Sequence, residues 1–249
     1  DEEQKTVLHE YFHAVQHAHV RDLDRDARDR KLGPVWWMEG AAEYMAMTTH
    51  ARLQAEGKIP VWDNGDWTFN FRNYRKNMGR KFRHASEDHK RHDCVAEMVR
   101  IDYDSPCRSF FYDGGAWAVA LLVSRHGEAV LLDEFYPRLA SMDFEAAFEA
   151  TFDQTPEAFY AEFRPLIEGK LGDALALLPG THAAVAGRPS ARIARVYSLC
   201  ICPLIAVAHR FLRILRRSQS IPKSAKYLGA RDDRGEDLKL HHRDGSSGH

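Results

Sequence analysis

The chain has 249 residues, of which 44% are hydrophobic and 29% are charged, which is typical of a soluble globular protein with one sizeable core and an appendage. An apolar run of 13 residues at 196–208 falls short of the ~20 that a membrane-spanning helix needs, so we expect no transmembrane span. The net charge of −1 conceals an asymmetry, because residues 1–173 carry 22 basic and 31 acidic residues, whereas residues 174–231 carry 10 basic and no acidic ones. We therefore expect a domain over residues 1–173 and a basic, flexible, poorly ordered extension over residues 174–249.

The first half of the sequence predicts two long helices. Apolar side chains recur with helical spacing over residues 6–19 and again over residues 35–53. Residues 21–31 between them alternate Arg and Asp, which predicts a solvated connection. Three aspartates in this connection resemble a calcium loop, but the glycine and terminal Glu of such a loop are missing, so we expect no calcium there.

Further helices are expected along the chain. Residues 60–110 mix aromatic, basic and histidine side chains, which favours aromatic packing under a surface region over binding of nucleic acid. Helices are then expected over residues 116–125 (opened by Gly114-Gly115), 130–139, 144–152 and 156–167. Alternating strand patterns are few, so the sequence predicts a mainly α fold.

The four cysteines leave two interpretations open. Cys94 and Cys107 can form a disulfide across a short loop, which would suit an oxidising compartment, or can remain two unpaired thiols. Cys200 and Cys202 are separated by one residue, which strains a mutual disulfide and does not match a C-x-x-C metal motif.

His9-Glu10-Tyr11-Phe12-His13 is an H-E-x-x-H motif within the first expected helix. Residues four apart lie on one face of a helix, so the imidazoles of His9 and His13 can reach a single ion. Glu10 lies about 100° around the helix from His9, where its carboxylate can accept a hydrogen bond from a water at the ion without binding the ion itself. The motif predicts a zinc site with Glu10 as the general base.

A third ligand is expected from the second long helix, because a catalytic zinc site uses three protein ligands and one open position. The segment WWMEGAAEY at residues 36–44 supplies Glu39. HEYFH followed by WWMEGAAEY resembles the gluzincin metallopeptidases, in which a Glu from a later helix completes the site. The tryptophan pair is similar to that of the bacterial collagenase branch and related secreted peptidases. The resemblance covers residues 7–47 and extends loosely over residues 112–167.

The resemblance implies zinc-dependent hydrolysis of peptide bonds in a protein or peptide substrate, by an endopeptidase. His9, His13 and Glu39 would hold Zn²⁺, and Glu10 would take a proton from water and return it to the leaving amine. Glu43, one turn after Glu39, would accept a hydrogen bond from a ligand histidine, the alternative being an ordinary solvated carboxylate.

Enzymes of this kind add a Tyr or His that donates a hydrogen bond to the developing oxyanion. Tyr112, just before Gly114-Gly115, is the residue that the resemblance favours for this role. The alternatives left open are Tyr74, Tyr103, His126, His84, His89 and His92.

In gluzincins a small sheet precedes the H-E-x-x-H helix, and its edge strand binds the extended substrate. That sheet is largely absent from this sequence, so we expect a fragment of a longer enzyme: a helical zinc-binding subdomain with weak proteolytic activity on its own. The resemblance implies an extracellular or periplasmic location and no nucleic-acid partner, and it leaves the oligomeric state open.

Three other functions remain open at this stage. The first is a non-catalytic module in which zinc only stabilises the fold, although such a site has no need of Glu10. The second is an exopeptidase, for which the sequence contains no motif that would anchor a substrate amine. The third is binding of a membrane or another anionic partner through the basic extension.

Overall fold

The computed structural model describes residues 2–20, 24–59 and 74–179. Over these ranges the fold is mainly helical, as the sequence predicts, and they contain no strand. None of the helices in this part of the chain is long and apolar enough to cross a bilayer. From residue 180 onward, the basic extension expected over residues 174–249 lies outside the described residues.

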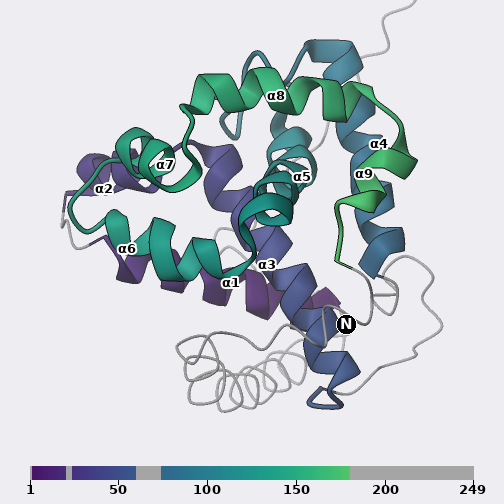
Figure 1. The fold of residues 1–249 in the computed structure, drawn as a ribbon, viewed down its shortest axis with the longest axis horizontal. Coiled ribbons are helices and arrows are strands. Elements are labelled where there is room, and N and C mark those ends of the chain that lie inside the picture. Colours follow the sequence, from purple (N-terminus) through teal and green to yellow (C-terminus); the bar gives the residue numbers. More distant parts are fainter. Residues whose placement is uncertain (1, 21–23, 60–73, 180–249) are drawn as a thin grey trace, which may run out of the picture. The chain divides into compact units, whose positions relative to one another are not determined.

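The elements follow one another along the chain as shown in Figure 1. They are α1 (Glu2–Ala18), α2 (Arg25–Leu32), α3 (Val35–Ala55), α4 (Tyr74–His92), α5 (Arg108–His126), the π-helix η2 (Leu131–Phe135), α6 (Tyr136–Arg138), α7 (Phe144–Phe152), α8 (Pro156–Glu168) and α9 (Leu171–Ala176). Helix α9 spans the domain boundary expected after residue 173, and Leu178 beyond it is buried in the core.

Helices α3 and α5 pack against each other at the centre of the fold, with α1 against α3 and α4 against α5 (Figure 1). Helices α3 and α5 meet at a pair of glycines, Gly40 and Gly115. A Cβ atom added to Gly40 would lie 2.4 Å from the backbone carbonyl carbon of Gly115, and one added to Gly115 would lie 2.5 Å from the carbonyl oxygen of Trp36. Only glycine permits this approach, which brings the carboxylates of α3 close to α5 and to the helix packed beyond it.

A cluster of aromatic rings fixes the start of α3. The indole of Trp37 lies 4.5 Å from the ring of Phe135 and 5.7 Å from that of Phe148, measured between centroids. Trp36 and Trp37 are both fully buried. A buried indole removes a large apolar surface from water, so these two residues stabilise the position of the first turn of α3. Glu39 follows directly after that turn.

The solvated connection predicted over residues 21–31 is helical over residues 25–31, which belong to α2 and are exposed or half-buried, as a solvated segment should be. Asp24 begins this helix by accepting a hydrogen bond from the backbone N–H of Ala27. Arg25 and Asp29 form an ion pair one turn apart, and Gly33 ends the helix with a φ of 90°. The alternation of Arg and Asp therefore supports a short exposed helix rather than a loop.

Helix α4 lies within residues 60–110, for which the sequence predicts no helix. Its buried stripe includes Met78, Phe82 and Ala85 at helical spacing, so an amphipathic period is present in the sequence, and the prediction missed it among the polar and charged side chains that make up most of the helix. The aromatic residues at positions 62, 67, 69 and 71, which are predicted to pack under a surface region rather than to bind nucleic acid, lie outside the described residues.

Two of the later helices differ from their predicted bounds. Helix α5 begins at Arg108, so Gly114 and Gly115 lie inside it instead of opening a helix at residue 116. The segment predicted as one helix over residues 130–139 begins as the π-helix η2 and continues as α6. The helices predicted over residues 144–152 and 156–167 are present as α7 and α8, begun by Asp143 and Thr155 respectively.

Candidate metal centre

The structure brings together the three residues predicted to bind metal. His9 and His13 lie one turn apart on α1, and Glu39 lies on α3. The Nε2 atom of His9 is 3.1 Å from Oε2 of Glu39 and 3.1 Å from Nε2 of His13, and the Nε2 atom of His13 is 3.4 Å from the same Glu39 oxygen. Two imidazole nitrogens and one carboxylate oxygen therefore converge, and this group can hold a metal ion.

The packing of α1 on α3 produces this convergence. The face of α1 that carries Leu8, Phe12 and Gln16 is buried, and the two histidines lie beside it. His9 and Glu39 are 8% and 7% exposed, so most of the site is already shielded from bulk water. Electrostatic interactions are stronger in such a place than in solution.

Each of the three side chains is held by a partner on its far side. The Nδ1 atom of His9 is 3.2 Å from Oε2 of Glu43, which is itself only 4% exposed. Glu43 is therefore not a solvated helix carboxylate. The other oxygen of Glu39 accepts a hydrogen bond of 2.5 Å from the hydroxyl of Tyr103.

Gln16 performs the corresponding role for His13. Its amide nitrogen donates to the carbonyl oxygen of Met38 and to the hydroxyl of Tyr136, so its oxygen is the atom that lies 2.7 Å from Nδ1 of His13. That oxygen can only accept, which places a proton on Nδ1 and leaves Nε2 available for an ion. Gln16 is not among the predicted site residues, although its spacing of three residues from His13 on one helix face would have indicated it.

Burial and neighbouring charges shift the ionisation of the site. Burial lowers the pKa of His9, but hydrogen bonds and charges from Glu39 and Glu43 outweigh it and raise that pKa to about 9. Burial raises the pKa of Glu39, but the neighbouring imidazoles of His13 and His9 and the hydroxyl of Tyr103 hold it well below its usual range. Without a metal, the imidazole of His9 therefore carries a proton on both nitrogens at neutral pH and faces Glu39 and Glu43 as a cation.

Glu10 and Tyr112, the two residues predicted to act in catalysis, both lie near His9. Glu10 follows His9 on α1 and is exposed. The rings of Tyr112 and His9 are 6.2 Å apart between centroids and are inclined at 44°. Burial raises the pKa of Tyr112, and the charges of Glu39, Glu43 and, least of the three, Glu10 raise it further, whereas Arg108 lowers it.

The alternatives to Tyr112 lie in different surroundings. Tyr103 contacts Glu39, as described above, whereas Tyr74 packs against the core beside Tyr44. The remaining candidates, with their surroundings, are His126 (against the ring of Phe152), His84 (3.3 Å from Asp113), His89 (3.1 Å from Glu168) and His92 (exposed at the end of α4).

A disulfide joins Cys94 to Cys107 and so decides between the two interpretations of these cysteines. The bond closes the segment that carries Tyr103 and ends where α5 begins. The hydroxyl that contacts Glu39 therefore belongs to a covalently closed loop, which has fewer conformations available to it than an open one.

Comparisons with protein-family models, with curated proteins and with solved structures found no match for this chain.

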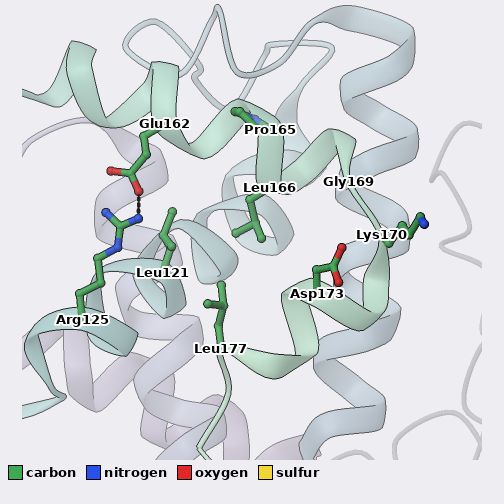
Figure 2. Close-up of a pocket in the computed structure, with 9 residues that line it drawn as sticks. All are labelled: Leu121, Arg125, Glu162, Pro165, Leu166, Gly169, Lys170, Asp173 and Leu177. Atoms are coloured by element: carbon green, nitrogen blue, oxygen red, sulfur yellow. Dashed lines mark ion pairs between the residues drawn. The ribbon is translucent and has the colours of Figure 1, made fainter.

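A separate cavity of about 310 Å³ lies between α5, α8 and α9 (Figure 2). The residues that line it are Leu121, Arg125, Glu162, Pro165, Leu166, Gly169, Lys170, Asp173 and Leu177. Arg125 and Glu162 form an ion pair across one side of it. None of the candidate metal-binding residues lines this cavity, so it is distinct from the site on α1 and α3.

Proposed function

We propose that this chain is the zinc-binding, catalytic part of a metallopeptidase of the gluzincin type, acting as an endopeptidase on a protein or peptide. The observation that carries the proposal is the convergence of Nε2 of His9, Nε2 of His13 and one oxygen of Glu39, with Glu10 next to His9 in the sequence. Such a triad beside a carboxylate that does not bind the ion is one of the arrangements used for zinc-dependent hydrolysis.

The spacing of the three ligand atoms supports zinc as the ion. Zinc binds nitrogen and carboxylate oxygen at about 2.0–2.1 Å in a tetrahedron, whose corners are then roughly 3.3–3.4 Å apart. The ligand atoms of this chain are 3.1, 3.1 and 3.4 Å apart. Three protein ligands leave the fourth corner for water or substrate, which distinguishes a catalytic site from a closed structural one.

The chemistry follows from the residues around the site. A bound zinc ion would polarise the substrate carbonyl and lower the pKa of water. Glu10 accepts a proton from the water whose oxygen bonds to the carbonyl carbon, and it passes that proton to the amine nitrogen as the C–N bond breaks. Tyr112 donates a hydrogen bond to the carbonyl oxygen as negative charge develops there. We keep Tyr112 in this role because the hydroxyl of Tyr103 is engaged with Glu39.

The disulfide also supports an extracellular or periplasmic location. Disulfides persist in oxidising compartments and are rare in reducing ones. The Cys94–Cys107 bond would therefore form after export of the protein.

Substitution of Glu10 by Gln tests the function. We expect the wild-type chain with zinc to cleave internally quenched peptides, and Glu10→Gln to retain zinc but lose at least about 100-fold in rate, the lower limit for removing a general base. Glu3→Gln, an exposed change on the same helix, is the matched control and should keep the wild-type rate. Equal rates for wild type and Glu10→Gln would refute the proposal, and bound zinc without any cleavage would favour the non-catalytic module.

A further inference from the structure

Behind His9 lies a group of buried charges that the proposed chemistry does not use. The carboxylate of Glu43 lies between two ammonium groups. The Nζ atom of Lys5 is 2.9 and 2.8 Å from its two oxygens, and the Nζ atom of Lys81 is 2.9 Å from Oε1. The Nζ atom of Lys81 also donates to Oδ1 of Asp113 at 2.6 Å. The side chains of Lys81, Glu43 and Asp113 are only 14%, 5% and 15% exposed.

These residues come from four different helices. Lys5 lies on α1, Glu43 on α3, Lys81 on α4 and Asp113 on α5. The contacts from Lys5, Lys81 and His9 occupy both oxygens of Glu43, which as a carboxylate has about four acceptor positions. A carboxylate bound on all sides has one available orientation, and in it Oε2 lies against Nδ1 of His9.

The charges of the group balance. Two lysines face two carboxylates, so the group is neutral as a whole, and the attraction between its charges offsets part of the cost of burying them. Burial lowers the pKa of Lys81, but Glu43 and Asp113 outweigh it and raise that pKa above its ordinary value. Lys81 therefore remains an ammonium group that donates to both carboxylates.

We propose that Lys81, held by Asp113, is a positioning residue of the metal site: it fixes the carboxylate of Glu43, which in turn fixes the ring of His9 with its Nε2 atom towards Glu39. This inference rests on the proposed metal site and assigns α4 and α5 a part in it. A role limited to joining α4 to the core would alter the stability of the fold but would leave the affinity and geometry of the metal site unchanged.

The test compares metal binding by the wild-type chain and Lys81→Met. Zinc affinity is measured by competition with a chelator, and the geometry of the site is measured from the visible absorption of bound Co²⁺. We expect Lys81→Met to lower zinc affinity about tenfold, which is the lower end of the range found for groups that support a metal ligand. We also expect the Co²⁺ spectrum to change. Lys90→Met, an exposed change on α4, is the control and should alter neither.

A second variant allows for the charge that Lys81→Met leaves unbalanced. Lys81→Met combined with Asp113→Asn removes one positive and one negative charge and should show the same loss of affinity. Wild-type affinity and spectrum in a folded Lys81 variant would overturn the inference alone. Failure of both variants to fold would also overturn it, because Lys81 would then be a structural residue. A wild-type chain that binds no metal would refute the proposed site and this inference with it.

Discussion

Metal binding to this chain should depend steeply on pH. In the metal-free protein Glu39 and Glu43 raise the pKa of His9 to about 9, so its imidazole carries a proton on both nitrogens at neutral pH. A metal ion needs the lone pair of Nε2 and must displace that proton. The pKa of His9 lies about two units above pH 7, and each unit lowers the apparent affinity about tenfold. At pH 7 the apparent affinity is therefore about 100-fold weaker than for an unprotonated His9, which is equivalent to about 2.7 kcal/mol.

The assay is a competition titration with a chelator of known pH dependence. We expect the apparent zinc affinity to rise about tenfold per pH unit above neutrality and to level off near pH 9. Calorimetry at pH 7 in buffers of different ionisation enthalpy should show about one proton released per zinc from this group. In Glu43→Gln the affinity should level off at lower pH, because one of the two carboxylates that raise the His9 pKa is gone. An affinity that does not change between pH 7 and pH 9 would refute the reasoning.

The same shift predicts how the stability of the metal-free protein depends on pH. The pKa of His9 in the fold, about 9, lies above its ordinary value of 6.5. Its contribution to stability is therefore complete below pH 6.5 and is lost as the pH rises to about 9. Thermal unfolding should show a falling midpoint over this window without zinc. With zinc bound, Nε2 of His9 no longer carries a proton, so His9 should cause no fall in the unfolding midpoint over this window.

Three further predictions concern the surroundings of the site. Tyr103→Phe removes the hydrogen bond to the ligand carboxylate and should lower zinc affinity about tenfold in chelator competition, with no loss of helical circular dichroism. Gly40→Ala should destabilise the fold by about 1–3 kcal/mol in urea unfolding, because its Cβ would meet backbone 2.4 Å away. Gly172→Ala, where nothing lies within 4 Å of the added atom, should stabilise it by up to about 1 kcal/mol, and equal effects of the two changes would contradict the packing argument. Replacing Cys94 and Cys107 by Ser should cost about 3 kcal/mol and lower the unfolding midpoint by about 6–12 °C, whereas an unchanged midpoint would show that the bond constrains nothing.

Several helices and the metal ligands themselves could be predicted from the sequence. Apolar side chains with helical spacing indicate α1, α3, α7 and α8, because these helices bury one face or nearly all of their surface. His9 and His13 could be paired because residues four apart share a helix face, which is a local relation. Glu39 was added because a catalytic zinc site needs a third protein ligand and because residues 36–44 resemble the segment that supplies it in gluzincins.

The parts that could not be predicted depend on contacts distant in the sequence. Lys81 meets a carboxylate 38 residues before it, and Tyr103 meets one 64 residues before it, so no local pattern marks either residue. Helix α4 buries a narrow stripe that packs on α5, and this stripe is easily missed among its many charged side chains, whereas α2 is an exposed helix of charged residues with little apolar pattern. The spacing of Cys94 and Cys107 permitted a disulfide without requiring one.

The most direct test of the central claim is the zinc content of the purified chain, measured by mass spectrometry for wild type, His9→Ala, His13→Ala and Glu39→Ala. The convergence of these three side chains predicts one zinc per wild-type chain and loss or marked weakening of binding in each variant. A wild-type chain that takes up no zinc after refolding in its presence, or three variants that retain it fully, would contradict the assignment of a metal centre to α1 and α3.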